Sequence, residues 1–175
     1  MSRVSFVIRD FLEKDADAVN HLAVAAFAEF QTAYSDWTAM VANLSKMSTL
    51  TAVGELMVAE RIGMIIGAVT YVAPHRPKAE FFDGGWPIVR MLVVDPKCRG
   101  QGIGSALMQE CVRRAKRDGA DVLALHSSPI MIAALAMYRD MGFAYRRDGT
   151  PVFGVPTAVN VDIFDRFATI AVQSE

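Results

Sequence analysis

Three glycines, Gly100, Gly102 and Gly104, stand between an apolar run and a segment with helical periodicity, in the stretch VVDPKCRGQGIGSALMQECVRRA (93–115). The unpaired N–H groups of a helix N-terminus and the positive end of its dipole attract anions, phosphate above all. Glycine removes the Cβ atoms that would keep a ligand from those donors, and Arg99 adds a full positive charge. The stretch therefore predicts a phosphate-binding loop, although a tight turn with close helix packing explains a glycine cluster equally well.

Two familiar phosphate loops do not fit this spacing. A Walker A loop needs Gly-Lys before its Ser or Thr, whereas Gly104 is followed directly by Ser105. A Rossmann fingerprint needs its glycines directly after the strand, but DPKCR intervenes here and Ser105 takes the place of the third small residue. Asp121, at about the right distance downstream, precedes its strand instead of ending it. A dinucleotide-binding enzyme stays only as a weaker alternative.

The string LVVDPKCRGQGIGSAL (92–107) resembles the acetyl-CoA-binding motif of the GNAT superfamily, the GCN5-related N-acetyltransferases. That motif is Arg/Gln-x-x-Gly-x-Gly/Ala after a strand and a Val-x-Pro turn, and Arg99, Gly102 and Gly104 match it. A second family segment, A-x-x-L-Y-x-x-x-G-F, resembles AALAMYRDMGF (133–143), with Met137 in place of the leucine. Both motifs stand in the family's order and spacing, and the resemblance covers essentially the whole chain.

The resemblance implies acetyl-CoA as the acyl donor and no metal ion. The pantetheine arm would pair with the backbone of Leu92, Val93 and Val94, and an N–H near Val93 would stabilise the tetrahedral oxyanion. The pyrophosphate would lie against the N–H groups of the glycine loop, with the Arg99 side chain as an aid. The residues implied in that loop are Arg99, Gly100, Gln101, Gly102, Ile103, Gly104 and Ser105.

Tyr138 resembles the family's general acid, which protonates the departing thiolate of coenzyme A and also contacts the cofactor. The alternative is a core tyrosine whose hydroxyl finds a partner. A phenol with a pKa of about 10 is a poor donor to a thiolate of about 8.5, so Tyr138 must be tuned or act mainly by hydrogen bonding. Ile88 stands where members of the family often carry a glutamate that acts as the general base. His126 is the first candidate for the general base, ahead of Glu80 and Asp83 acting through water.

Several other residues invite a functional reading. Met131 stands where many members place an asparagine that binds pantetheine, so Ser127 or Ser128 would have to substitute. Four basic residues, Arg113, Arg114, Lys116 and Arg117, are within the range of a 3′-phosphate contact, but such residues usually face water near a helix C-terminus. Three aromatic residues, Phe30, Tyr34 and Trp37, are candidates for the wall of the acceptor site or for core packing.

Composition limits the class of protein. The 175 residues suit a single domain, 1–175, and a net charge of -1 gives no general attraction to nucleic acid or membrane. The two cysteines, Cys98 and Cys111, lack metal-ligand spacing and fit a reducing compartment. The longest apolar stretch, 64–73, is about half a membrane span, so we expect a cytoplasmic protein. The resemblance implies a small-molecule or peptide amine as acceptor, and we expect a homodimer.

Periodicity predicts the order strand, two helices, three strands, helix, strand, helix, two strands, which is an α/β sandwich with a mixed sheet. The resemblance makes this the GNAT fold, with about six to seven strands and about four helices. Ser35 is expected to cap the second helix, and Ser128 with Pro129 to begin the last one. The expected strands are 4–9, a pair within 55–72, and then 88–94, 122–125, 143–147 and 158–164. The expected helices begin after residues 15, 35, 104 and 129. Residues 73–87 are expected to form a loop with at most a short strand near Phe81.

Besides the weaker dinucleotide-binding alternative, two functional hypotheses remain after the sequence alone. The first is an acetyl-CoA-dependent N-acetyltransferase in which a primary amine attacks the thioester directly within a ternary complex, with Tyr138 as general acid. The second is a non-catalytic sensor that binds acyl-CoA with the same loop. Ile88 in place of a glutamate favours the sensor, and the intact motif around Tyr138 favours the enzyme. The sequence does not select the amine.

Overall fold

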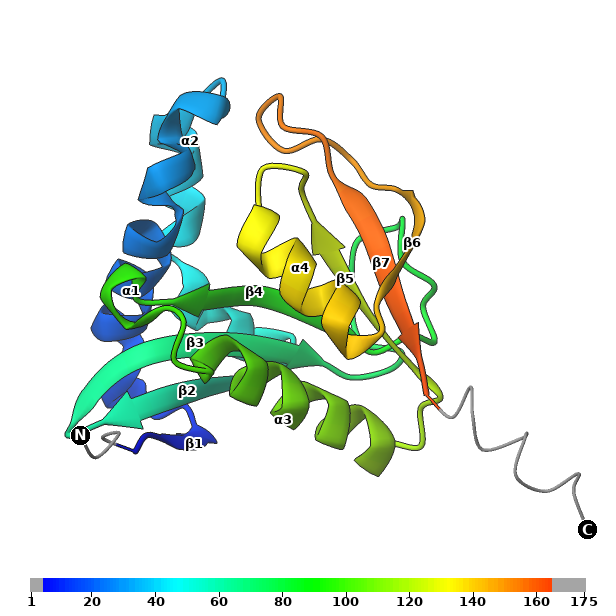
Figure 1. The fold of residues 1–175 in the computed structure, drawn as a ribbon, viewed down its shortest axis with the longest axis horizontal. Coiled ribbons are helices and arrows are strands. Elements are labelled where there is room, and N and C mark those ends of the chain that lie inside the picture. The colour runs from blue at the N-terminus through cyan, green and yellow to red at the C-terminus, as the bar shows by residue number, and fades with distance from the viewer. Residues whose placement is uncertain (1–4, 165–175) are drawn as a thin grey trace, which may run out of the picture.

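A single mixed sheet organises the protein in the computed structural model, which describes residues 5–164 (Figure 1). The seven strands lie in the order β1-β2-β3-β4-β5-β7-β6, and helices cover both faces. The strands are β1 (Val7–Asp10), β2 (Glu55–Arg61), β3 (Met64–Val72), β4 (Ile88–Val94), β5 (Val122–Ser127), β6 (Ala144–Asp148) and β7 (Ala158–Ile163). The helices are α1 (Ala16–Phe27), α2 (Trp37–Leu44), α3 (Ile103–Arg117) and α4 (Ile132–Met141). The predicted architecture is confirmed.

The side chains of the strands alternate between two layers of core. We call the side covered by α3 and α4 the α3 face, and the side covered by α1 and α2 the α1 face (Figure 1). Met57 of β2 packs with Leu107 of α3 in the core of the α3 face. Its neighbour Val58 packs with Val19 of α1 on the α1 face. The sheet therefore separates the two helix pairs.

Some element boundaries differ from the sequence prediction. The second helix is capped by Asp36, whose carboxylate accepts a hydrogen bond from Ala39 N at 2.9 Å, and not by Ser35. The last helix begins only after Met131, because Ser128 instead accepts a hydrogen bond from Ile130 N at 3.5 Å in the turn before it. No strand forms near Phe81, where the chain makes turns. Val4, expected in the first strand, lies outside the described residues.

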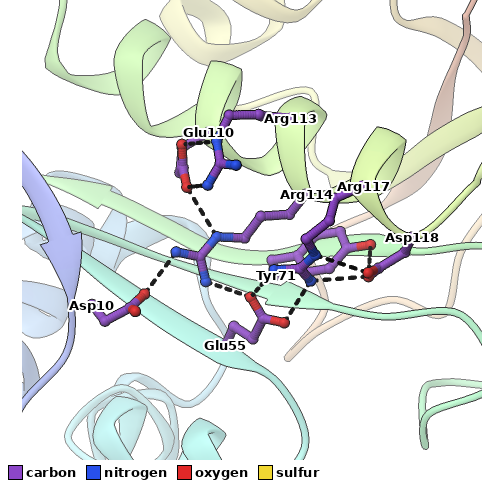
Figure 2. Close-up of polar contacts among 8 residues, drawn as sticks. All are labelled: Asp10, Glu55, Tyr71, Glu110, Arg113, Arg114, Arg117 and Asp118. Carbon is purple, nitrogen blue, oxygen red and sulfur yellow. Dashed lines mark hydrogen bonds and ion pairs between the residues drawn. The ribbon is translucent and has the colours of Figure 1, made fainter.

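The C-terminal half of α3 is held to the sheet by an ion-pair network (Figure 2). Arg114 is its centre: this side chain is 10% exposed and pairs with Asp10 at 2.6 Å, Glu110 at 3.0 Å, and Glu55. Arg117 pairs with Glu55 as well, at 2.7 Å. The eight residues drawn together are Asp10, Glu55, Tyr71, Glu110, Arg113, Arg114, Arg117 and Asp118. Because Asp10 and Glu55 belong to β1 and β2, the network fixes α3 on the sheet.

Candidate functional site

The site begins where β4 and β5 stop pairing. These two strands are parallel, and their register contains only Ile88 with Ala124 and Val89 with Leu125. Beyond Val89, β4 continues to Val94 while pairing only with β3. Figure 1 shows the two strands diverging from their paired end. Alternate N–H and C=O groups of a strand point to opposite sides, so the outer groups of β4 face this opening without a strand partner.

A β-bulge lies at the point of divergence. Met91 has a φ of 58°, and the register with β3 shifts between Ala68 and Thr70. A bulge inserts one residue into the ladder and re-aims the side chains around it. Val89 and Leu92 both pack in the core of the α3 face, while Met91 packs on the α1 face. The strand therefore changes its side-chain pattern where the opening starts.

The glycine loop closes the far end of the opening. Gly102 is the N-cap of α3, with a φ of 83° that favours glycine, and a Cβ there would meet no atom within 4 Å. A Cβ on Gly67 of β3 would approach Ile103 Cγ2 to 2.8 Å, so α3 rests directly on the sheet at its first turn. The free N–H groups at the start of α3 thus stand in open space, as an anion site requires.

The glycine loop also touches α4. A Cβ on Gly104 would lie 3.5 Å from Met137 Sδ and 3.7 Å from Val94 Cγ2. The two sequence motifs and the end of β4 are thereby brought together on the α3 face. Leu92, Val93 and Val94 form the last part of β4, directly before the turn that leads to Arg99.

The Arg99 side chain points away from a ligand position over the loop. Its guanidinium pairs with Glu29 and donates a hydrogen bond to the carbonyl oxygen of Ala26 at 2.9 Å. Both partners belong to the end of α1 and the 3-10 turn that follows it. The backbone of the loop is open, while its cation is engaged with the α1 side.

Tyr138 lies on the α3 face and is 8% exposed. Its ring packs against Phe143 with the centroids 5.9 Å apart. Burial raises the pKa of the Tyr138 hydroxyl above its ordinary value of 10.0, and the nearby Cys111 adds to the shift. The hydroxyl therefore stays protonated at neutral pH. Tuning toward the pKa of a thiol is not observed, so hydrogen bonding is the role that this group can perform.

His126 lies on the α1 face of β5, opposite to Tyr138. Its ring stacks on Phe81 with the centroids 4.9 Å apart, and its Nε2 is buried without a hydrogen-bond partner in the described part of the chain. Burial lowers the pKa of His126 below 6.5, so the imidazole is neutral at pH 7. A neutral imidazole beside the diverging strands can accept a proton.

The other candidates are placed less favourably. Asp83 Oδ1 accepts a hydrogen bond from Gly85 N at 2.9 Å, and Glu80 is exposed in the same loop, next to the Phe81 that covers His126. The Ser127 hydroxyl accepts a hydrogen bond from Asn160 Nδ2 at 2.7 Å. Ile88 is 3% exposed and belongs to the core, which leaves no carboxylate at that point of β4.

The aromatic residues of the first helices pack on the α1 face together with the β6–β7 loop. Tyr34 is buried there, and Phe30, Trp37 and Phe153 are half-buried around the same core. A backbone hydrogen bond of 2.8 Å from Ser35 N to Phe153 O joins the start of α2 to this loop. The α1 face is thus walled by aromatic groups that remain partly accessible.

Three of the four basic residues late in α3, Arg113, Arg114 and Arg117, belong to the network of Figure 2, and Lys116 lies over the Phe164 ring. Arg113 pairs with Glu110 at 2.5 Å, and Arg117 pairs with Asp118 at 2.9 Å. Arg114 lies roughly 16 Å along the helix axis from Ile103, at 1.5 Å per residue. Residues 5–164 contain no cluster of potential metal ligands, and no helix in that range is long and apolar enough to cross a membrane.

One charged residue at the start of the opening was not singled out from the sequence. Arg90 is the only charged residue in β4, IVRMLVV, and it is exposed at the point where β4 leaves β5. A lone charge inside an apolar run of a central strand was the signal that could have found it, because such a strand is otherwise buried on both faces.

Comparison with known proteins agrees with this geometry. Residues 16–143 match the profile described as the Acetyltransferase (GNAT) family. An IAA acetyltransferase of Azospirillum brasilense is 29% identical over 90 residues, which are 51% of this chain and 54% of that protein, so the match spans about half of the relative's length. A GCN5-related N-acetyltransferase of Rhodopseudomonas palustris has a TM-score of 0.72 at 17% identity, covering 94% of this chain and 99% of the other. A GNAT family acetyltransferase of Brucella melitensis, solved in complex with acetyl-CoA, has a TM-score of 0.62 at 21% identity, covering 93% and 90%.

Proposed function

Because the chain belongs to the GNAT family of acetyltransferases, we propose that it transfers the acetyl group of acetyl-CoA to the nitrogen of a primary amine. The observation that carries this proposal is the end of β4–β5 pairing at Val89, beside a helix N-terminus whose Gly102 is open to solvent. An extended pantetheine arm fits the unpaired edge of β4 as an added strand would. The pyrophosphate fits the N–H groups from Arg99 to Ser105.

The two faces of the sheet supply the two ends of the reaction. The amine nitrogen attacks the thioester carbonyl carbon, and its proton passes to neutral His126 on the α1 face. The carbon–sulfur bond of the tetrahedral intermediate then breaks, and the thiolate of coenzyme A is stabilised by a hydrogen bond from Tyr138 on the α3 face. Both substrates must be bound together for this direct transfer, so the complex is ternary.

An acetyl-CoA titration by calorimetry tests the donor half of the proposal, with NAD and ATP as competitors for the same loop. We expect acetyl-CoA alone to bind, and we expect Gly102→Glu to abolish binding because the carboxylate occupies the anion position. Gly119→Glu is the matched control: Gly119 has a φ of 73°, near the 83° of Gly102, and a Cβ there also meets nothing within 4 Å. Equal loss in both variants would trace the effect to backbone strain and contradict a phosphate loop.

A sensor that binds acyl-CoA without turnover is the second candidate, favoured by the apolar Ile88 where the family carries a base. Release of the coenzyme A thiol in the presence of an amine panel separates the two. Turnover supports the enzyme, and tight binding without turnover on any amine supports the sensor. Light scattering on the same sample tests the predicted homodimer.

A further inference from the structure

Arg90 is an exposed cation in the middle of the sheet. β4 is the fourth of seven strands in the sheet order, and two other residues of this strand, Ile88 and Val93, are only 3% and 2% exposed. A central strand between two helix layers normally buries both of its faces. Arg90 nevertheless reaches solvent, and within residues 5–164 it has no ion pair and no side-chain hydrogen bond.

The β-bulge directs this side chain to the α1 face. Ile88 packs with Val72 and Phe82 on the side of the sheet opposite to α3, and Val89 packs on the α3 face, so strand alternation turns Arg90 away from the α3 face. Met91, at the bulge, also packs on the α1 face, and Leu92 returns to the α3 face. Arg90 and Met91 therefore point to the same side of the sheet, which is also the side of His126.

The strands on either side of β4 each carry a buried polar atom that has no hydrogen-bond partner among residues 5–164. Thr70 is the register partner of Arg90 on β3, is fully buried, and has no hydrogen-bond partner for Oγ1. On β5, His126 follows Leu125, the last residue paired with β4, and its Nε2 is also buried without a partner, near Gly149. An unpaired buried polar group destabilises the fold, so each one needs an explanation, and a bound water or ligand is one such explanation.

We propose that Arg90 binds a carboxylate of the acceptor, so that the substrate is an amine that also carries a carboxylate, as an α-amino acid does. The guanidinium offers a fork of donors that matches the two oxygens of a carboxylate. Arg90 and His126 are the first residues of their strands beyond the last paired position, Val89 with Leu125, so a carboxylate held by Arg90 and an amine beside His126 would both lie at the start of the opening. The half-buried Phe30, Trp37 and Met91 favour an apolar substituent on the same molecule. This inference rests on the proposed acetyl transfer.

The test compares α-amino acids with their own amides, which keep the amine and side chain but lack the carboxylate. The panel runs through several apolar amino acids, and kcat/KM is measured by release of the coenzyme A thiol. We expect the wild type to prefer the acids, and Arg90→Gln to lose about 10- to 100-fold on the acids with little change on the amides. Arg90→Lys should retain part of the preference. Arg146→Gln, at an exposed position on edge strand β6, is the matched control and should leave both values unchanged.

Acetyl-CoA titrations of the wild type and Arg90→Gln separate this inference from the proposed function. Equal affinity in the two proteins is expected; no affinity in the wild type overturns the acetyltransferase proposal itself. With the cofactor bound, an equal loss on acids and amides, or a wild-type preference for amides, overturns the role of Arg90 alone. If no acceptor in the panel turns over, N-acetyl amino acids are titrated into protein saturated with coenzyme A. Absence of Arg90-dependent binding there also overturns it.

Discussion

The Arg99 guanidinium pairs with the Glu29 carboxylate and so joins the glycine loop to the turn that follows α1. Both side chains are largely exposed, at 40% and 49%, so the pair is screened by solvent and easily exchanged. A pyrophosphate at the start of α3 would compete with Glu29 for the same cation. The Arg99 guanidinium can therefore pair either with Glu29, after α1, or with an anion bound at the glycine loop.

Glu29→Gln should tighten acetyl-CoA binding, because it frees the Arg99 charge and removes a negative charge close to an anionic ligand. The expected gain is about 2- to 5-fold, the range of exposed ion pairs, and it should shrink as salt is added. Calorimetry at low and high salt measures both effects. Glu13→Gln, an exposed change in the first 3-10 turn, is the control and should have no effect. Weaker binding by Glu29→Gln would mean that the pair holds the loop in its binding shape.

Tyr138→Phe should reduce kcat by about 10²-fold with acetyl-CoA affinity retained, because the hydroxyl acts on the departing thiolate and the ring keeps its packing. Rapid-mixing assays and calorimetry give the two quantities. Tyr71→Phe is the matched control, since it removes a buried tyrosine hydroxyl that donates a hydrogen bond to Asp118 at 2.8 Å on the same face. Unchanged turnover in Tyr138→Phe would return Tyr138 to a packing role.

His126 should set the acidic limb of the pH profile. Burial lowers its pKa, so kcat/KM should fall with acid only below about pH 6.5, where the imidazole becomes protonated. His126→Gln should lower kcat/KM by about 10²-fold or more at pH 7 and recover toward high pH, where the amine loses its own proton. His21→Gln, at an exposed position on α1, serves as control. A constant loss at every pH would assign His126 to packing against Phe81.

Arg114→Met should lower the free energy of unfolding by about 1–3 kcal/mol, because it removes a nearly buried cation that bridges three carboxylates, of which Glu55 and Glu110 keep a second arginine. Urea unfolding followed by circular dichroism measures the change. Arg113→Met is the control on the same helix: the Arg113 side chain is 63% exposed and, among residues 5–164, pairs with Glu110 alone, so little change is expected. Similar stability in both variants would show that the network does not hold α3.

Acid should unfold the protein partly through Glu110. Hydrogen bonds from Arg113 and Arg114 lower the pKa of Glu110 to about 2, below its unfolded value near 4.3. A group with a lowered folded pKa stabilises above the unfolded pKa and loses this contribution as the pH falls toward the folded one. Stability should therefore decline between about pH 5 and 2, and Glu110→Gln should flatten the decline. An unchanged slope in Glu110→Gln would assign the acid sensitivity to other carboxylates.

The loop and its glycines could be predicted from the sequence because their signal is local: positive φ at Gly102 and the helix start at Ile103 depend on neighbouring residues alone. Tyr138 was found through its motif. The helix caps were less predictable, because Ser35 and Asp36 are both good capping residues. In the structure the Ser35 backbone N–H donates a hydrogen bond to Phe153 O, and Asp36 caps the helix.

The exposed position of Arg90 could not be predicted in the same way. Its exposure depends on the short register between β4 and β5 and on the bulge at Met91, and both are properties of strands far apart in the chain. A one-residue shift in the register of a strand moves each side chain to the opposite face of the sheet. The alternation in IVRMLVV alone therefore does not tell which side chains lie on which face.

The short pairing of β4 with β5 also separates the sheet into two parts that are expected to unfold independently. The ladder that joins β1–β4 to β5, β7 and β6 is two residues long, whereas β5 and β7 pair over their whole lengths. Cooperative units in native-state hydrogen exchange follow such boundaries, so β5–β7 and β1–β4 are expected to open separately. A ligand that pairs with the free edge of β4 would lengthen this junction, and the two units would then exchange as one.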